Sequence, residues 1–285
     1  MQLQQPRSRI FGLDLLRTCA IGCVVLVHSS FILAPSFPGF PWIPLPDGVD
    51  LFFVLSGFLI GGMLITRLEA TGGLDASGLF DFIQRRWFRT LPNYFLFLGL
   101  NCVLVYLKWI PGSLNKYLLT FFVFFQNFYI PFDFLFWESW SLSVEEWFYL
   151  SFPLFCFLLF RIRKWKVSKM LLLLILGYLV LPLVYRIYSA APGSTVEHWD
   201  LFVRKLVLTR LDSIGFGLLA AYLYYYRNAF WNKVRYVFFA IGLSGTILLC
   251  LIRIPPVTFF FTDLLPKPFG TLHCHVTAPV KQYSR

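Results

Sequence analysis

The chain has 285 residues, of which 58% are hydrophobic and only 14% are charged. A soluble globular domain has about 45–50% apolar and about 25% charged residues, so this composition excludes an ordinary soluble protein and indicates a polytopic protein of the lipid bilayer. The net charge of +11 fits basic loops on the cytoplasmic side of a membrane and does not predict a nucleic-acid partner. Most of the six cysteines lie in apolar runs, where they pack as small hydrophobic residues.

A transmembrane helix needs about 20 largely apolar residues, and the sequence contains several such runs. They predict an all-α, polytopic transmembrane helical domain over residues 1–254, followed by an atypical C-terminal tail at 255–285. Seven runs predict spans: residues 10–33, 48–66, 91–110, 143–160, 170–188, 206–226 and 236–253. The shorter run 117–130 predicts a re-entrant or peripheral segment, and an eighth span is the alternative.

Basic residues predict the orientation of these spans, because cytoplasmic loops carry an excess of Lys and Arg. The N-terminus carries Arg7 and Arg9, the segment 161–169 carries five basic residues, and the segment 35–46 carries none. We therefore expect the N-terminus and 161–169 in the cytoplasm and 35–46 on the opposite side. The expected localisation is a multi-pass protein of the plasma (inner) membrane, and the sequence leaves the oligomeric state open.

The first predicted span carries three ionisable residues. Asp14 lies one helical turn before Arg17 and is placed to pair with it. Arg17 and His28 are eleven residues apart, so they share one helix face with an axial separation of about 16 Å. Because an Arg or Asp in the centre of a membrane helix costs about 2.5–3.5 kcal/mol, this stripe must face protein or water. A buried ion pair with a hydrogen-bonded histidine is one interpretation, and a functional channel is the other.

Two further stretches combine apolar runs with polar residues. The stretch "DGVDLFFVLSGFLIGG" (47–62) carries Asp50 and small residues that allow close approach of helices. The stretch "FIQRRWFRTLPNY" (82–94) carries three arginines, which either anchor a cytoplasmic boundary or bind phosphate. Its Pro92 predicts a nearby helix start.

A fourth stretch, "FWESWSLSVEEWFYLSFPLF" (136–155), carries two adjacent glutamates. Glu145 and Glu146 point to different helix faces because they are sequence neighbours. Glu145 and Tyr149 share one face. Acids at the start of a helix are the simpler interpretation, and a catalytic carboxylate is the alternative.

These four stretches, in this order, resemble the successive motifs of the acyltransferase-3 family of integral membrane acyltransferases. The stretch "RLDSIGFGLLAAY" (210–222) resembles a later family segment, and the resemblance covers roughly residues 8–225. It implies transfer of an acyl group, commonly acetyl, from a coenzyme A donor to a hydroxyl of a carbohydrate or another cell-envelope molecule. After Ile254 the chain departs from the family pattern, which predicts a C-terminal truncation.

The resemblance and the chemistry of acyl transfer together suggest roles for individual residues. A hydroxyl becomes a good nucleophile when a base takes its proton, and histidine is the commonest base. We predict His28 as that base and Glu145 as the carboxylate that orients it, with an acyl-His28 intermediate as the alternative. Residues predicted to bind the phosphates of acyl-CoA, in the first instance acetyl-CoA, are Arg17, Arg86 and Arg89. The separation of Arg17 from His28 approximates the reach of the pantetheine arm.

Other functions stay open at this point. Intramembrane Asp, Arg, His and Glu also occur in transporters and exporters, and an inactive truncated homologue is a further alternative. The sequence predicts no metal cofactor, because "HCH" at 273–275 lacks a fourth ligand. The predicted partners are the lipid bilayer, acyl-CoA and a hydroxyl-bearing acceptor such as a glycan.

Overall fold

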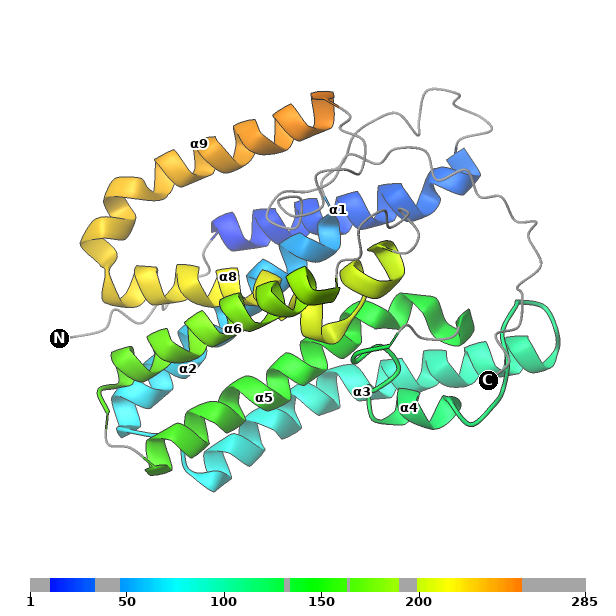
Figure 1. Ribbon diagram of the computed structural model, residues 1–285, viewed down its shortest axis with the longest axis horizontal. Coiled ribbons are helices and arrows are strands. Elements are labelled where there is room, and N and C mark those ends of the chain that lie inside the picture. Colours follow the sequence, from blue (N-terminus) through cyan, green and yellow to red (C-terminus); the bar gives the residue numbers. More distant parts are fainter. Residues whose placement is uncertain (1–10, 34–46, 131–133, 163–164, 190–198, 253–285) are drawn as a thin grey trace.

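The computed structural model describes residues 11–33, 47–130, 134–162, 165–189 and 199–252. Every regular element in these ranges is a helix, so the all-α prediction is confirmed there. The long helices (Figure 1) are α1 (Phe11–Leu33), α2 (Gly48–Thr71), α3 (Ala76–Tyr106), α5 (Trp140–Ile162), α6 (Val167–Ser189), α8 (Val207–Tyr226) and α9 (Asn228–Ile252). The short elements are α4 (Leu118–Phe122), the 3₁₀ helix η2 (Phe134–Ser139) and the π-helix η3 (Asp200–Arg204).

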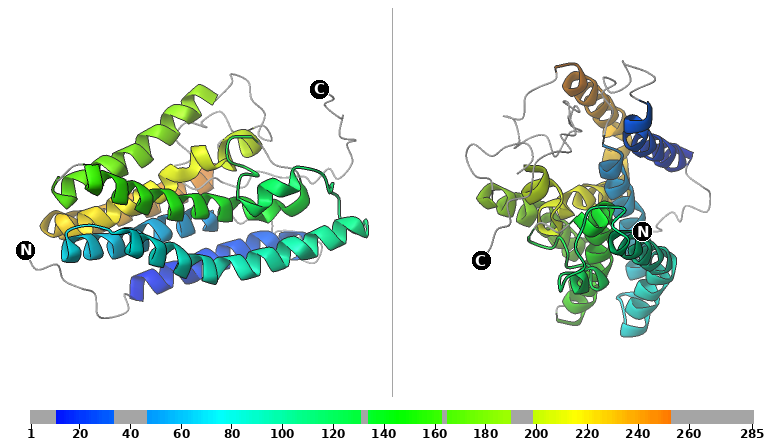
Figure 2. Two further views of the ribbon diagram at one scale, coloured as in Figure 1. Left: turned by 90° about the horizontal axis from the view of Figure 1, so that it is seen from below. Right: turned by 90° about the vertical axis from the view of Figure 1, so that its right-hand side faces the viewer.

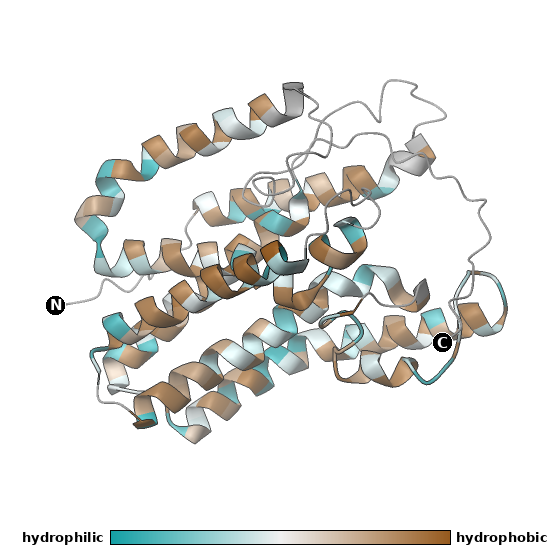
Figure 3. Cartoon of the chain, in the orientation of Figure 1, coloured by the Kyte–Doolittle hydropathy of each residue, from teal (hydrophilic) through white to brown (hydrophobic). Residues whose placement is uncertain are grey.

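Several of these helices are long and apolar enough to cross a bilayer. In the described part of the chain there are five such segments: Phe11–Ser29, Gly48–Thr71, Ala76–Tyr106, Leu135–Ile162 and Val167–Ser189. They correspond to the first five predicted spans, and Figure 3 shows hydrophobic residues along most of their length. The last two predicted spans form α8 and α9, and their crossing of the membrane stays a prediction.

Helix α3 extends well before the predicted span 91–110. Its N-cap is Asp75, whose side chain accepts a hydrogen bond of 2.9 Å from the Gly78 backbone N–H. The arginine-containing turns that follow are too polar to read as a span, but arginine favours a helix. Our expectation that Pro92 lies near a helix start is wrong: Pro92 lies inside α3, where the loss of one backbone hydrogen bond does not end so long a helix.

Successive long helices alternate in direction (Figures 1 and 2). Helix α3 ends at the same end of the bundle at which α5 begins. Within 117–130 the only α-helix is the five-residue α4, which is too short to span a bilayer. The re-entrant or peripheral character of this segment stays a prediction. The same alternation places the α2–α3 and α5–α6 connections at one end of the bundle, as the charge pattern predicts.

Helix α8 lies in the centre of the bundle and packs mainly against α2 and α6. The contact with α2 depends on Gly57 and Gly217, which face each other. A Cβ atom at Gly57 would overlap the Ile214 carbonyl oxygen, and one at Gly217 would overlap the Val54 carbonyl oxygen. The two backbones therefore touch, a close approach that only small residues permit.

Buried ion pairs tie the same helix to its neighbours. Arg210 of α8 is only 1% exposed and pairs with Asp50 of α2. Asp212, also on α8, pairs at 2.5 Å with Arg186 of α6. Each charge thus meets an opposite charge on an adjacent helix, which avoids the large cost of an unpaired charge in an apolar interior.

Helices α1 and α9 lie at the edge of the bundle (Figure 1). Helix α1 packs mainly against α2, and α9 packs mainly against α8. Most described side chains of both helices are exposed or only half-buried. In a bilayer these faces contact lipid or other protein, so the firmly packed part of the molecule is α2, α5, α6 and α8 with α3 beside them.

Changing Gly57→Ala should destabilise the protein, because the added methyl group forces the α2 and α8 backbones apart. Overpacking of this kind costs about 1–3 kcal/mol. The matched control is Gly177→Ala on α6, where no atom lies within 4 Å of an added Cβ. There the change should leave stability equal or slightly higher, since Ala favours a helix over Gly. Thermal unfolding of the purified proteins measures both, and equal melting temperatures would contradict the close contact.

Candidate active site

Glu145 of α5 is the centre of a polar cluster between α2 and α5. One of its carboxylate oxygens accepts a hydrogen bond of 2.7 Å from the Ser56 hydroxyl, and the other accepts one of 2.9 Å from the Tyr149 hydroxyl. The Tyr149 hydroxyl also lies 3.5 Å from the Ser56 hydroxyl. The prediction that Glu145 and Tyr149 share a helix face is confirmed. Both oxygens of the carboxylate are held, so its orientation is fixed by two helices.

The arginines of α3 lie beside this cluster. The Arg86 guanidinium lies 5.7 Å from the centroid of the Tyr149 ring, within the range of a cation–π contact. The charges of Arg86 and Arg89 both act on the Glu145 carboxylate. Two of the three arginines predicted to bind a donor are therefore brought together with the predicted catalytic glutamate.

Glu146 lies outside the Glu145 cluster and contacts α3. It is only 4% exposed, and it accepts a hydrogen bond of 2.7 Å from the Thr90 hydroxyl of α3. The two adjacent glutamates thus face different helices, Glu145 toward α2 and Glu146 toward α3, as the sequence predicted. Glu146 helps to hold α3 against α5 next to the cluster.

His28 lies apart from the cluster. Its side chain is exposed on α1, and it has no hydrogen-bond or ion-pair partner among the residues that the structure describes. An added Cβ at Gly48, the first residue of α2, would meet Val24, so His28 lies one turn beyond the start of α2. Ser56 lies eight residues in the other direction, and the axial separation of His28 from Ser56 is therefore about 18 Å. The structure does not bring His28 to Glu145.

Arg17 lies on the same peripheral helix. It pairs at 2.9 Å with Asp14, as predicted, and the two side chains are 43% and 48% exposed. Among the described residues, no hydrogen bond or ion pair joins this pair to Arg86 or Arg89. The third arginine of the predicted donor site is thus on α1, whereas the other two are on α3.

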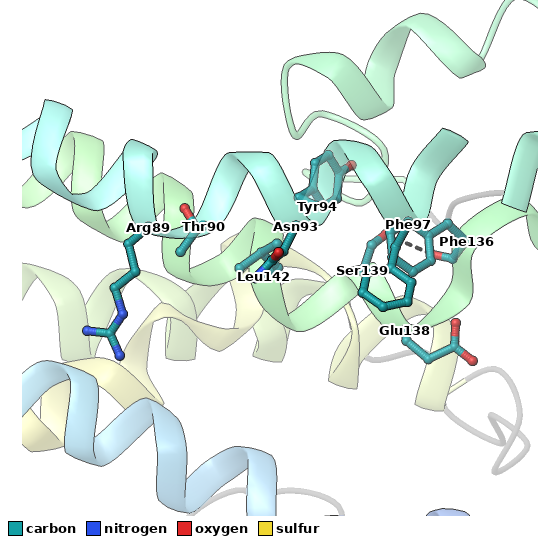
Figure 4. Close-up of a pocket in the computed structure, with 9 residues that line it drawn as sticks. All are labelled: Arg89, Thr90, Asn93, Tyr94, Phe97, Phe136, Glu138, Ser139 and Leu142. Atoms are coloured by element: carbon teal, nitrogen blue, oxygen red, sulfur yellow. Dashed lines mark hydrogen bonds between the residues drawn. The ribbon is translucent and has the colours of Figure 1, made fainter. Parts of the chain in front are cut away.

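A cleft of about 310 Å³ opens next to the cluster (Figure 4). One wall is a single face of α3, and the other is formed by η2 and the first turn of α5. Its lining residues are Arg89, Thr90, Asn93, Tyr94 and Phe97 on α3, with Phe136, Glu138, Ser139 and Leu142 opposite. Two lining residues connect the cleft to the cluster. Arg89 lies one helical turn after Arg86, which contacts the Tyr149 ring, and the Thr90 hydroxyl donates to Glu146, the neighbour of Glu145.

A network of ion pairs lies at the N-terminal end of α2 and joins it to η3. The Asp47 side chain caps α2 by accepting from the Val49 N–H at 2.9 Å, and it pairs with Arg204 of η3 at 2.5 Å. Arg204 also pairs with Asp200 at 3.0 Å. Burial alone would raise the pKa of the Asp47 carboxyl, but the Arg204 guanidinium outweighs burial and holds that pKa below its usual range.

Sequence reasoning missed several of these partners. Ser56 and Thr90 were not assigned as partners of the glutamates, and Arg204 was not singled out. The sequence offers only a weak indication of these partners: Ser56 and Thr90 lie within stretches that also carry charged residues. Spacing along one helix cannot show which residue of another helix lies opposite, and all three contacts join different helices.

In the described residues, no group of three or more His, Cys, Asp and Glu side chains is placed to hold a metal ion. The "HCH" stretch at 273–275 lies outside these residues.

Comparison with known sequences decides the family. The model of the acyltransferase-3 family, described as an acyltransferase domain, matches residues 10–273. The chain belongs to the acyltransferase-3 family. The match extends past the 8–225 region that carries the motif resemblance, and it includes part of the tail that we expected to be atypical. No solved structure matches the chain at a significant level.

Several known proteins are similar in sequence to this chain. The peptidoglycan O-acetyltransferase OatA of Listeria monocytogenes is 30% identical over 203 residues, covering 66% of this chain and 30% of that protein. The O-acetyltransferase OatA of Staphylococcus aureus is 26% identical over 227 residues, covering 75% and 34%. An uncharacterized protein of Haemophilus influenzae is 32% identical over 251 residues, covering 81% and 98%. The matched region is thus about a third of the length of the OatA proteins.

Changing Asp47→Asn should destabilise the protein at neutral pH by about 1.5–3 kcal/mol, the usual cost of losing a hydrogen bond to a charged group. The folded-state pKa of Asp47 is depressed, so its stabilisation is full above the unfolded-state pKa of about 3.9 and is lost as the pH falls through the lower folded-state value. The stability difference between wild type and Asp47→Asn should therefore shrink in acid.

Thermal unfolding from pH 7 down to about pH 3 measures this difference. Arg204→Gln serves as the matched partner variant, because it removes the same ion pair from the other side. The double variant should cost less than the sum of the two single variants. A difference that stays constant across this pH range would contradict an ionised Asp47 held by Arg204.

Proposed function

We propose that this chain is a membrane-bound O-acyltransferase that moves an acyl group, in the first instance acetyl, from acyl-CoA to a hydroxyl of a carbohydrate or another cell-envelope acceptor. Family membership supports the acyl transfer. The names of the OatA relatives, one of which acts on peptidoglycan, support an O-acetyl group and a glycan hydroxyl. An enzyme is favoured over a transporter because the family is defined by acyl transfer.

The observation that carries this proposal is the convergence of Arg86, Arg89 and Glu145 beside Ser56. Acyl transfer needs a site for an anionic donor and a group that manages the proton of the acceptor hydroxyl. Arginine forks match phosphate oxygens, and the nearby carboxylate stabilises positive charge that develops on a base. The contact of Arg86 with the Tyr149 ring and the hydrogen bond of Ser56 to Glu145 support this assignment.

In the proposed reaction, the acceptor hydroxyl oxygen forms a bond to the acyl carbon, and the bond from that carbon to the coenzyme A sulfur breaks. The hydroxyl proton passes to a base and then to the leaving thiolate, so the products are an ester and coenzyme A. We propose His28 as this base, with Glu145 assisting it.

Pairing of these residues requires a rearrangement of α1, because the described arrangement separates His28 from Ser56, the partner of Glu145, by about 18 Å along the helix axis. Helix α1 packs mainly against α2, so this rearrangement would break the close approach of Gly48 to Ala20 and Val24. Because Arg17 lies on the same helix as His28, it would move together with His28. A protein in which α1 cannot move would then bind the donor without completing the transfer.

We propose a plasma (inner) membrane location with the N-terminus in the cytoplasm. Coenzyme A esters are cytoplasmic, so a donor site near the cytoplasmic end of the bundle is required. Helix α3 begins at the end of the bundle that carries the α5–α6 connection (Figure 1), which the charge pattern assigns to the cytoplasm. Arg86 and Arg89 follow in the first half of α3, which supports donor entry from that side.

His28→Ala and Glu145→Gln should each lower the rate of acyl transfer, because general-base contributions are typically about 10²–10⁴-fold. Glu146→Gln should lower it less, since a glutamine still accepts the hydrogen bond from Thr90. The measurement is transfer of labelled acetyl from acetyl-CoA to envelope glycans, followed by mass spectrometry of the product. A His28→Ala protein that keeps more than about half of the wild-type rate would exclude a catalytic His28.

Arg86→Ala and Arg89→Ala should weaken acetyl-CoA binding by about tenfold or more, the equivalent of one lost charged hydrogen bond. Lysine at either position should restore the affinity only in part, because it lacks the bidentate fork. The matched control is Arg85→Ala, an exposed arginine on the same helix. Direct binding of acetyl-CoA to the purified protein measures all five variants, and equal affinity in the wild-type and both alanine variants would place the donor elsewhere.

A further inference from the structure

The cleft beside Glu145 has two distinct ends. Five of its lining residues, from Arg89 to Phe97, lie on one face of α3 and extend over about 12 Å of the helix. Arg89 marks the end next to the Glu145 cluster. Glu138 marks the other end, in η2 just before α5 begins. The cleft therefore leads away from the predicted reaction centre toward the end of the bundle at which α3 terminates.

The walls of the cleft are held in place before any ligand binds. The Tyr94 hydroxyl donates to the Phe121 carbonyl at 2.8 Å, and its ring stacks on Phe136 with centroids 5.7 Å apart. On the opposite wall the Ser139 hydroxyl donates to the Phe136 carbonyl at 2.7 Å and accepts from the buried Gln126 amide at 3.3 Å. A site on such a fixed frame costs little ordering when it binds.

The lining combines aromatic rings with polar groups that are available to a ligand. Asn93 and Glu138 are exposed, and neither has a hydrogen-bond or ion-pair partner within the described ranges. Phe97, which is 52% exposed, and Phe136 offer apolar surface between them. An alkyl chain would leave the amide and the carboxylate unsatisfied when it displaced their water. A hydroxylated ring has apolar C–H faces for the phenyl rings and donors and acceptors for Asn93 and Glu138.

We propose that this cleft binds a sugar ring of the acceptor and presents its hydroxyl to the Glu145 cluster. This inference rests on the proposed function for the identity of the reaction, but not for the binding itself. The volume of about 310 Å³ is at the lower end of the range for small-ligand pockets, which fits a short segment of a glycan. Arg89 then stands between the donor and acceptor sites, where the two substrates meet.

Binding of tetra-N-acetylchitotetraose to the full chain in lipid nanodiscs tests the proposal, with saturation-transfer NMR as the readout. This neutral glycan tests binding without turnover. Phe97→Ala and Asn93→Ala should each weaken binding by about fivefold to tenfold, the loss of a ring contact or of a hydrogen bond. The matched control is Asn101→Ala, a half-buried asparagine further along α3 whose amide bonds only to its own helix at the Phe97 carbonyl. It should bind like the wild type.

The outcomes separate this proposal from the proposed function. Binding that is lost in the two cleft variants but kept in Asn101→Ala supports the sugar site, even if no acyl transfer is detected. Equal binding by the wild type and both cleft variants overturns it. Absence of glycan binding in a wild-type protein that transfers acetyl to another hydroxyl compound also overturns it, while the proposed function stands. Weaker acetyl-CoA binding in Phe97→Ala, with glycan binding unchanged, would reassign the cleft to the donor and overturn the proposal.

Discussion

The pairing of buried opposite charges between neighbouring helices organises this helical bundle. An isolated charge in hydrocarbon is costly, so the polar residues of the spans pair across helix boundaries. Asp50 with Arg210 and Arg186 with Asp212 join α8 to α2 and to α6. The helix with the most polar interior face is thereby the one that the others surround. Glu145 lies outside these ion pairs, since its oxygens accept hydrogen bonds from the neutral hydroxyls of Ser56 and Tyr149.

This arrangement gives the candidate site a fixed part and a peripheral part. Helices α2, α3 and α5 bring Ser56, Arg86 and Glu145 together, and each of these helices packs on another long helix. His28 and Arg17 lie on α1, which packs mainly on one neighbour.

The sequence predicted what depends on local spacing and failed where the result depends on packing. Helix positions, the Asp14–Arg17 pair and the shared face of Glu145 and Tyr149 all follow from hydropathy or from helix geometry. Ser56 as the partner of Glu145 joins residues 89 positions apart, so no periodicity could reveal it. The Pro92 error arose because an interior proline was read as a boundary although good helix formers precede it. The roles of His28, Glu145 and the arginines came from motif resemblance and stay proposals.

The contact between Gly57 and Gly217 has a consequence for how this protein can change during evolution. Gly57 is the immediate neighbour of Ser56, so the residue that sets the distance between α2 and α8 adjoins the residue that holds Glu145. A larger side chain at either glycine would displace α2 sideways and move the Ser56 hydroxyl away from its carboxylate. Selection for a well-packed bundle and selection for an aligned carboxylate therefore act on the same few atoms. Substitutions in this part of α2 are therefore constrained twice, whereas the exposed side chains of α9 meet no such double constraint.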